Sequence, residues 1–233
     1  MRRRGGTMNC SVIIAAAGQG KRMQSDINKQ YIRLKEKPIL AHTIEAFEKV
    51  EEINEIILVV SKNEIDLCSQ LVVKPYGFKK VKKIIGGGKE RQDSIYEGLQ
   101  VLSKETDVVL IHDGARPFIK EKEIKKSIQV AHQEGACVVG VRVKDTIKLV
   151  NKEQCILQTP DRSQLWSVQT PQVFQYKILK RAYEKAKEDH FMGTDDASVV
   201  ERLGIPVKII EGQYSNIKIT TPEDLVYGEI ILA

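Results

Sequence analysis

Short apolar runs rich in β-branched residues alternate along the chain with longer segments in which apolar residues recur at every third or fourth position. The apolar runs cover residues 11–16, 55–60, 82–85, 107–112 and 136–143, and the segments between them cover 38–49, 65–73, 91–103 and 121–134. In the first of these segments Leu40, Ile44 and Phe47 share one face at helical spacing. Strands that alternate with helices in this way predict an α/β fold, with a mostly parallel, doubly wound, Rossmann-like sheet covered by helices on both faces.

Residues 144–173 break this pattern. Residues 145–150 alternate between polar and apolar, residues 151–153 have the composition of a turn, and residues 155–159 run back toward the main body. The pattern predicts a β-hairpin arm inserted into the α/β domain. Because an isolated hairpin is only marginally stable in water, we expect the arm to pack on a second subunit.

The α/β pattern resumes after the arm. We expect helices over residues 176–189, 196–203 and 222–232, and a strand over residues 207–210. A chain of 233 residues can bury one sizeable core, so a single domain over residues 8–233 is expected, with 144–173 as its β-arm. Residues 1–7 precede Met8 and are expected to form a disordered leader.

The net charge of +6 raises the question of a nucleic-acid partner. Three of the positive charges lie at residues 2–4, and the remaining excess is interspersed with acids, as in the run K-E-K at residues 35–37. Scattered charge of this kind is typical of solvated helix faces rather than of a surface that follows a phosphate backbone. We therefore expect no nucleic-acid partner.

The cysteines and the apolar runs indicate the compartment. The four Cys residues show neither a C-x-x-C motif nor a His at metal-ligand spacing, so buried or free thiols in a reducing cytosol are expected. No apolar run approaches the roughly 20 residues of a membrane helix, and the basic leader lacks the apolar region of a signal peptide. We expect a cytoplasmic protein that does not bind a membrane.

A small-residue loop follows the first apolar run and reads A-A-A-G-Q-G-K-R-M from position 15. Gly18 and Gly20 allow backbone N–H groups to approach phosphate oxygens, and Arg22 and Lys29 add positive charge. The loop matches neither a P-loop nor a dinucleotide-binding fingerprint, because each of these needs a glycine at a position where this chain has another residue. The pattern favours a polyphosphate-binding loop, and a glycine turn before a solvated charged segment is the alternative.

Two further motifs follow predicted strands. Gly86-Gly87-Gly88 precedes a helix whose Ser94 could offer its hydroxyl to the edge of a planar ring, although three glycines could also form only a flexible turn. Asp113, in H-D-G-A-R-P, could hold a divalent cation through oxygen or instead cap the helix after Pro117. Ligands of parallel sheets bind at the carboxyl ends of the strands, so both motifs are expected at one crevice.

Two motifs near the C-terminus have simple structural interpretations as well as functional ones. The G-T-D-D sequence at residues 193–196 reads as an N-cap whose acids complement the dipole of a short helix. Lys218 is flanked by apolar residues on a predicted edge strand, where a lysine is usually only solvated. That strand would nevertheless end near the same crevice.

In this order and spacing the motifs resemble the 2-C-methyl-D-erythritol 4-phosphate cytidylyltransferase family of the non-mevalonate isoprenoid pathway. The resemblance extends from about Met8 to the last residue. It implies a nucleotidyltransferase fold, CTP and a sugar-alcohol phosphate as substrates, and Mg²⁺ as cofactor. It also implies a homodimer in which each arm crosses to the neighbouring subunit.

The resemblance further implies roles for individual residues. The first loop and a following lysine would hold the triphosphate of CTP: Ala15, Ala16, Ala17, Gly18, Gly20, Arg22 and Lys29. The second loop would receive cytosine and ribose through Gly88, Arg91 and Ser94. Asp113 would lie near Mg²⁺, with Arg116 beside the substrate. Arg162 and Lys218 would bind the sugar-alcohol phosphate, and Thr146, Thr194 and Asp195 would line the same pocket. Gly114 stands where the family usually has Ala, a small-for-small change.

The chemistry of such a reaction agrees with the residue types present. A phosphate monoester has a second pKa near about 6, so it is largely dianionic at pH 7 and needs no general base to attack. None of the four His residues is therefore required for catalysis. The reaction requires in-line placement of two anions and neutralisation of charge at the α-phosphorus, which Arg22, Lys29 and Mg²⁺ would supply.

Two other functions share parts of this pattern. A ribitol-5-phosphate cytidylyltransferase would share the fold and the CTP site, although the segments K-Q-Y at 29–31 and 216–221 look more like the erythritol enzyme. A catalytically inactive nucleotide-binding protein would keep Gly88 and Ser94 but could lose Arg22, Lys29 or Lys218. All three are present, which favours an enzyme.

Overall fold

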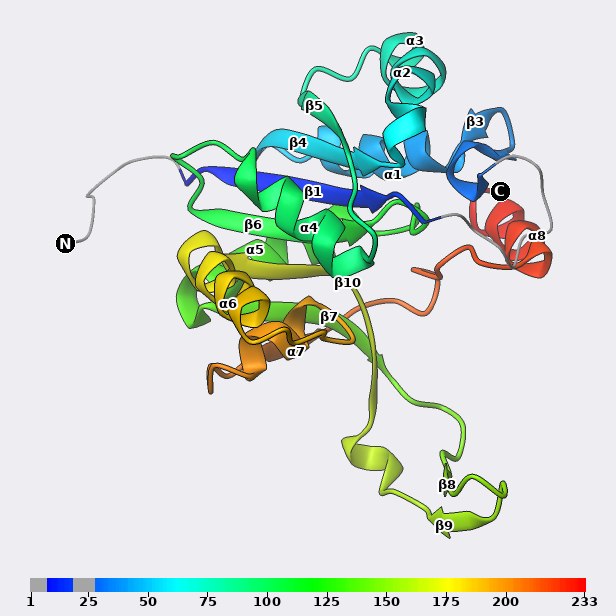
Figure 1. Ribbon diagram of the computed structural model, residues 1–233. Coiled ribbons are helices and arrows are strands. Elements are labelled where there is room, and N and C mark those ends of the chain that lie inside the picture. Colours follow the sequence, from blue (N-terminus) through cyan, green and yellow to red (C-terminus); the bar gives the residue numbers. More distant parts are fainter. Residues whose placement is uncertain (1–7, 19–27) are drawn as a thin grey trace.

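A seven-stranded sheet in the order β11-β7-β10-β6-β1-β4-β5 forms the centre of the protein (Figure 1). The computed structural model describes residues 8–18 and 28–233. The strands of this sheet are β1 (Cys10–Ala16), β4 (Ile53–Val60), β5 (Val81–Gly86), β6 (Val108–Asp113), β7 (Ala136–Arg142), β10 (Trp166–Gln175) and β11 (Lys208–Glu211). The helices are α1 (Ile39–Glu48), α2 (Ile65–Cys68), α3 (Lys74–Tyr76), α4 (Arg91–Gln100), α5 (Glu121–Glu134), α6 (Tyr176–Glu188), α7 (Asp196–Glu201) and α8 (Pro222–Ile231).

The predicted α/β fold with a mostly parallel sheet is confirmed. Strands β6, β1, β4 and β5 pair in parallel, as do β7 and β11. Strand β10 lies between β6 and β7 and runs antiparallel to both. The predicted arm, residues 144–173, extends too far along the chain. Trp166–Gln175 is a strand of the central sheet, so the segment that leaves the body ends near residue 165.

The helices cover both faces of the sheet because successive residues of each strand point to opposite sides. In β1, Val12 and Ile14 pack in one apolar cluster with α1 and α5, whereas Ile13 packs in the other with α4, α6 and α7. The predicted segment 65–73 is helical but irregular, because α2 continues through a π-helical turn (Ser69–Val73) into α3. This stretch ends at Gly77, whose φ of 62° is left-handed.

The carboxyl ends of four neighbouring strands lie level with one another. Ala15 of β1 is opposite Asp113 of β6, Ala16 is opposite Val60 of β4, and Val60 is opposite Gly86 of β5. The loops that follow these strands therefore start at the same edge of the sheet. This register brings together the motifs that the sequence analysis placed at one crevice.

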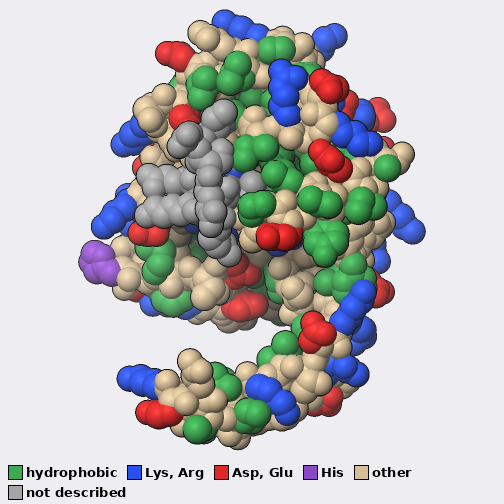
Figure 2. Space-filling view, turned by 90° about the vertical axis from the view of Figure 1, so that its right-hand side faces the viewer, with side chains coloured by type: hydrophobic (Ala, Val, Ile, Leu, Met, Phe, Trp, Pro, Cys, Tyr) green, Lys and Arg blue, Asp and Glu red, His purple; other side chains and the backbone are tan. Residues whose placement is uncertain are grey.

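A narrow arm extends from the body between β7 and β10 (Figure 1). It carries a small hairpin of β8 (Leu149–Val150) and β9 (Ile156–Gln158), followed by a 3₁₀ turn at Arg162–Gln164. Its apolar side chains are exposed: Leu149 is 53% exposed, Ile156 61% and Leu157 62%. In Figure 2 the arm stands away from the body, with an open hollow between them.

The C-terminal part returns to the crevice edge of the sheet. Residues 212–221 form no strand, so the prediction of an edge strand around Lys218 is wrong. Helix α8 packs near the short β2 (Arg33–Leu34) and β3 (Lys37–Pro38) pair, over a cluster that contains Leu34, Phe118 and Ile219. Among the described residues, no helix combines the length and apolar character needed to cross a bilayer.

Candidate active site

One pocket lies at the carboxyl ends of β1, β5 and β6. The residues that line it come from the small-residue loop, the glycine loop, the end of β6 and the C-terminal segment: Ala15, Ala16, Ala17, Gly18, Lys29, Gln30, Gly88, Lys89, Glu90, Arg91, Ser94, Asp113, Gly114, Ala115 and Lys218. Most of the residues that the sequence predicted for substrate binding thus meet at one place. Gly20 and Arg22 lie outside the described residues.

The glycine loop is held against the start of α4 by Ser94. The hydroxyl of Ser94 donates to the carbonyl of Glu90 at 3.0 Å and accepts from the backbone N–H of Gly88 at 3.2 Å. A Cβ on Gly87 would lie 2.6 Å from Ser94 Oγ and 2.8 Å from Ala17 Cβ, so only glycine fits between these two loops. Ser94 lines the pocket and also shapes the loop.

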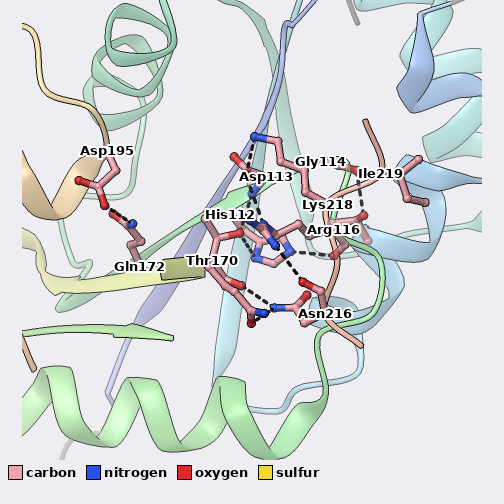
Figure 3. A network of polar contacts seen from close by, with 12 residues as sticks. His112, Asp113, Gly114, Arg116, Thr170, Gln172, Asp195, Asn216, Lys218 and Ile219 are labelled. Atoms are coloured by element: carbon pink, nitrogen blue, oxygen red, sulfur yellow. Dashed lines mark hydrogen bonds and ion pairs between the residues drawn. The ribbon is translucent and has the colours of Figure 1, made fainter. Parts of the chain in front are cut away.

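Asp113 is surrounded by three cations. Lys218 Nζ lies 2.9 Å from Asp113 Oδ2, and Arg116 Nε lies 3.4 Å from the same oxygen (Figure 3). Arg91 Nε lies 3.5 Å from Oδ1. Burial acts to raise the pKa of Asp113, but attraction to Lys218, Arg91 and Arg116 outweighs it and lowers the pKa well below its usual range. The carboxylate is therefore ionised throughout the physiological range.

Arg91 links this carboxylate to a second, fully buried one. Its Nη2 donates to Asp196 Oδ2 at 2.7 Å, and Asp196 also accepts from the hydroxyl of Tyr183. Burial acts to lower the pKa of Arg91, but the attraction of Asp196 and Asp113 outweighs it and raises the pKa. Arg91 therefore lines the pocket and also neutralises the buried carboxylate of Asp196.

A polar network behind Asp113 fixes the H-D-G-A-R-P segment. His112 Nε2 donates to the carbonyl of Arg116 at 3.0 Å, so its Nδ1 accepts from the hydroxyl of Thr170 at 3.0 Å. The hydroxyl of Thr170 in turn accepts from the backbone N–H of Asp113 at 3.1 Å. Burial lowers the pKa of His112 to about 4, so the ring is neutral and serves as a structural hydrogen-bonding group.

The segment that carries Lys218 is tied to this network by Asn216. Its amide donates to the carbonyl of Thr170 and to Gln169 Oε1, each at 3.0 Å. Arg116 Nη1 donates to the carbonyl of Asn216 at 2.8 Å (Figure 3). These contacts explain how a segment without regular secondary structure can place Lys218 on Asp113.

Several predicted substrate-binding residues lie elsewhere in the fold. Arg116 lies behind Asp113 and is absent from the pocket lining in the described part of the chain. Thr146 and Arg162 are exposed on the arm, where Arg162 Nη1 donates to the carbonyl of Lys144 at 2.7 Å. Thr194 is exposed, and Asp195 accepts from Ser198 N–H at 2.9 Å as the N-cap of α7, which confirms the N-cap interpretation of this motif.

The structure also corrects or refines smaller points. Helix α5 begins after Lys120, so Asp113 does not cap the helix after Pro117. A Cβ on residue 114 would lie 2.9 Å from Ala16 Cβ and 3.2 Å from the carbonyl oxygen of Ala15, so Gly114 allows closer packing of the two strand ends than an alanine would. Gln30, Lys89, Glu90 and Ala115 also line the pocket, although no individual role was predicted for them from the sequence.

Comparisons with known proteins agree with this geometry. Residues 10–233 match the family model of 2-C-methyl-D-erythritol 4-phosphate cytidylyltransferase. A protein of that name from Alkaliphilus metalliredigens is 56% identical over 222 residues, which cover 95% of this chain and 92% of the relative. The corresponding protein from Clostridioides difficile is 51% identical over 222 residues, with 95% and 93% covered.

The chain belongs to the 2-C-methyl-D-erythritol 4-phosphate cytidylyltransferase family. Solved structures share its fold. The crystal structure of 4-diphosphocytidyl-2C-methyl-D-erythritol synthase from Anaerococcus prevotii has a TM-score of 0.85 at 34% identity and covers 97% of this chain and 96% of its own. The Francisella tularensis 2-C-methyl-D-erythritol 4-phosphate cytidylyltransferase has a TM-score of 0.81 at 30% identity, with 96% and 99% covered.

The members of this family act on charged substrates, and the pocket has the groups to receive them. Small residues and glycines line two sides of the pocket, and Lys29, Arg91 and Lys218 supply positive charge. The sole carboxylate at the strand ends, among the pocket-lining residues described, is Asp113, while Glu90 lies at the start of α4. The arrangement can bind a polyphosphate and a second anion and can neutralise charge between them.

The donor set also fits a Mg²⁺ ion of the kind that arrives with a nucleotide. Within residues 8–18 and 28–233 there is no group of three or more His, Cys, Asp or Glu that could hold a metal by itself. Mg²⁺ in nucleotide sites takes one or two carboxylates together with phosphates and water. Asp113 alone meets that need, because its carboxylate is ionised and lies at the pocket wall.

Proposed function

We propose that the chain transfers the cytidylyl group of CTP to 2-C-methyl-D-erythritol 4-phosphate. The products are 4-diphosphocytidyl-2-C-methyl-D-erythritol and pyrophosphate, in isoprenoid precursor biosynthesis. The observation that carries this proposal is the pocket in which two glycine-containing loops meet the Asp113–Lys218 pair. The family membership supports the same activity.

The reaction is an in-line displacement at the α-phosphorus of CTP. An oxygen of the sugar-alcohol phosphate forms a bond to this phosphorus, and the bond to the β-phosphate oxygen breaks, so that pyrophosphate leaves with the electron pair. The attacking phosphate is largely dianionic at pH 7, since its second pKa is near about 6, and needs no base. The neutral, buried His112 is in keeping with this requirement.

The cations have separate roles in this proposal. Lys29, at the pocket wall, and Arg22, seven residues before it in the sequence, neutralise charge that builds up during displacement. Lys218 binds the phosphate of the sugar alcohol. Asp113 would hold Mg²⁺, and the ion would supply Lewis-acid neutralisation of the charge that builds up during displacement. Gly88, Arg91 and Ser94 border the space for cytosine and ribose.

The arm completes the site of a partner subunit in a homodimer. Thr146 and Arg162 are exposed on the arm and lie outside the lining of their own subunit's pocket, as far as the structure describes it. The apolar side chains of Leu149, Ile156 and Leu157 are more than half exposed and need a partner surface. A second copy of the chain provides both a surface for them and a pocket for Arg162.

The state of the cysteine side chains supports a proposal for the cellular compartment. All four cysteines are free, and burial raises the pKa of Cys10, Cys68 and Cys137 to about 12. Unpaired, protonated thiols are typical of proteins in a reducing compartment. We place the enzyme in the cytoplasm on this basis.

Pyrophosphate release from CTP tests the proposal and separates it from the nearest alternative. Purified protein is incubated with CTP, Mg²⁺ and either 2-C-methyl-D-erythritol 4-phosphate or ribitol 5-phosphate, with a chelator control. We expect turnover with the erythritol substrate that stops when the metal is removed. Robust turnover of ribitol 5-phosphate with none of the erythritol substrate would instead assign the second function.

A further inference from the structure

Glu64 is a buried carboxylate that lies outside the pocket and accepts hydrogen bonds from residues on both sides of Lys29. It is 8% exposed and follows β4 in a short 3₁₀ turn. Its Oε1 accepts from the amide of Asn28, and its Oε2 accepts from the amide of Gln30 at 3.2 Å and from the hydroxyl of Tyr31 at 3.4 Å. The three donors are thus residues 28, 30 and 31, which flank Lys29 in the sequence.

The turn that carries Lys29 has little to hold it in place by itself. It is a 3₁₀ helix of 3 residues, Lys29–Tyr31, and its N-cap residue Asn28 makes no side-chain capping bond. A turn this short has too few internal hydrogen bonds to fix a side chain. Glu64 supplies three bonds from outside the turn, and the carboxylate is compensated at a buried position by these neutral donors.

Gln30 extends this contact to the small-residue loop. Its amide also donates to the carbonyl of Ala16 at 2.8 Å, at the end of β1. Lys29 Nζ donates to the carbonyl of Ile219 at 3.2 Å, next to Lys218. Glu64, which follows β4, therefore holds the segment around Lys29, and Gln30 links this segment to the end of β1. Glu64 itself is not among the described residues that line the pocket.

We propose that Glu64 is a positioning residue that holds the backbone around Lys29 so that its ammonium group faces the transferring phosphoryl group. The proposal rests on the role of Lys29 in the proposed function. A carboxylate suits the task because it only accepts hydrogen bonds, whereas all three neighbours donate. Glutamine in the same place would turn an N–H₂ group toward at least one of these donors.

Steady-state kinetics of Glu64→Gln test this role. A small displacement of a catalytic group can cost about 10²-fold in rate, so we expect kcat to fall by about 10- to 100-fold with a smaller change in the KM for CTP. In the Lys29→Ala background, Glu64→Gln should cause little further loss, because the group that it positions is already gone. An equal loss in both backgrounds, or an unchanged kcat in the single variant, would overturn the proposal.

Glu48→Gln is a matched control far from the pocket. Glu48 also accepts several bonds, from the backbone N–H groups of Lys79 and Lys80, so its loss has a comparable structural effect. We expect this variant to keep wild-type kcat. If Glu64→Gln fails to fold, Asn28→Ala removes a single donor to Glu64 and should give the same pattern at smaller size, and full additivity with Lys29→Ala in that variant would equally contradict the proposal.

A second measurement does not depend on turnover. The ε-amino groups are methylated with ¹³C-formaldehyde, and the Lys29 signal is identified by its loss in Lys29→Arg. In the wild type we expect a shifted, broadened signal typical of a restrained side chain, which Glu64→Gln moves toward the position of exposed lysines. An unchanged signal would refute positioning by Glu64 even if the wild-type enzyme proved inactive on the proposed substrates.

Discussion

Lys218 Nζ lies 2.9 Å from Asp113 Oδ2 and joins the C-terminal segment to the end of β6 (Figure 3). The side chain of Lys218 is 37% exposed and that of Asp113 is 10% exposed, and both residues line the pocket. The pair keeps a cation at the pocket wall and balances the charge of Asp113 before any substrate arrives.

Lys218→Gln should weaken binding of the sugar-alcohol phosphate more than binding of CTP. A hydrogen bond to a charged group contributes about 1.5–3 kcal/mol, so the KM for 2-C-methyl-D-erythritol 4-phosphate should rise by about ten- to a hundredfold. The KM for CTP should change by much less. Initial rates at varied concentrations of each substrate measure both effects. Lys83→Gln is the control. Lys83 donates to the carbonyl of Val101, and its substitution should leave the KM values for both substrates unchanged.

Arg91→Met should destabilise the fold as well as lower activity. The substitution leaves the Asp196 carboxylate, which is fully buried, without its cation. Breaking a buried pair in this way costs about 3–5 kcal/mol, and the bond from Tyr183 that remains favours the lower end. Urea unfolding measures the change. The double variant Arg91→Met/Asp196→Asn should recover most of the stability, and failure to recover any would show that the cation acts on stability through some other group.

The alternation of strands and helices was predictable because each buried parallel strand is a short apolar run and each helix has one apolar face. Strand β10 was assigned to the arm because it follows the hairpin directly and carries polar residues such as Gln169 and Gln172. These side chains are satisfied inside the protein, where Gln169 accepts from Asn216 and Gln172 donates to Asp195. The sequence around β10 does not indicate these hydrogen-bond partners, which lie far from it along the chain.

The residues of the candidate site were likewise only partly predictable from the sequence. Ala15–Gly18, Gly88 and Asp113 could be placed in one crevice from the sequence because they lie at or just after strand ends, where the register of a parallel sheet brings loops together. Arg116 lies three residues after Asp113, and sequence spacing could not tell that its guanidinium turns toward the carbonyl of Asn216, 100 residues away. Glu64 belongs to no motif, and only the fold reveals its contacts around Lys29.

Stability should rise with pH between about 4 and 6.5 because of His112. Burial lowers the pKa of His112 from 6.5 to about 4, so the unfolded chain binds a proton in this range that the folded protein does not. The contribution of His112 to the free energy of unfolding is fully present above about pH 6.5. It is lost as the pH falls toward 4, and the loss is about 3 kcal/mol at most. The free energy of unfolding, measured in urea across this range, should lose most of this dependence in His112→Gln.

A matched change at another histidine separates this effect from general acid sensitivity. Burial also lowers the pKa of His42, which is bonded to the carbonyl of Leu34, but His42 is only half-buried whereas His112 is fully buried. His42→Gln should therefore remove only a small part of the slope. Equal slopes in the wild type and in His112→Gln would mean that His112 titrates normally in the folded protein.

Mixing two inactive variants tests whether the arm serves the neighbouring subunit. Arg162→Ala removes a residue of the arm, and Arg22→Ala removes a residue of the CTP loop. In a mixed dimer one site carries both lesions and the other carries none. With random exchange about half of the dimers are mixed, so activity should return to about a quarter of wild-type sites. No recovery after verified subunit exchange would place Arg162 in the site of its own subunit.

The fate of labelled oxygen tests the central claim that the substrate phosphate attacks the α-phosphorus of CTP in this pocket. 2-C-methyl-D-erythritol 4-phosphate with ¹⁸O in its phosphate oxygens is incubated with CTP and Mg²⁺, and both products are analysed by mass spectrometry. We predict that all of the label appears in the CDP-alcohol and none in pyrophosphate, with no turnover in Lys29→Ala beyond a small residual rate. Label in pyrophosphate, or release of pyrophosphate without a labelled CDP-alcohol, would contradict the account.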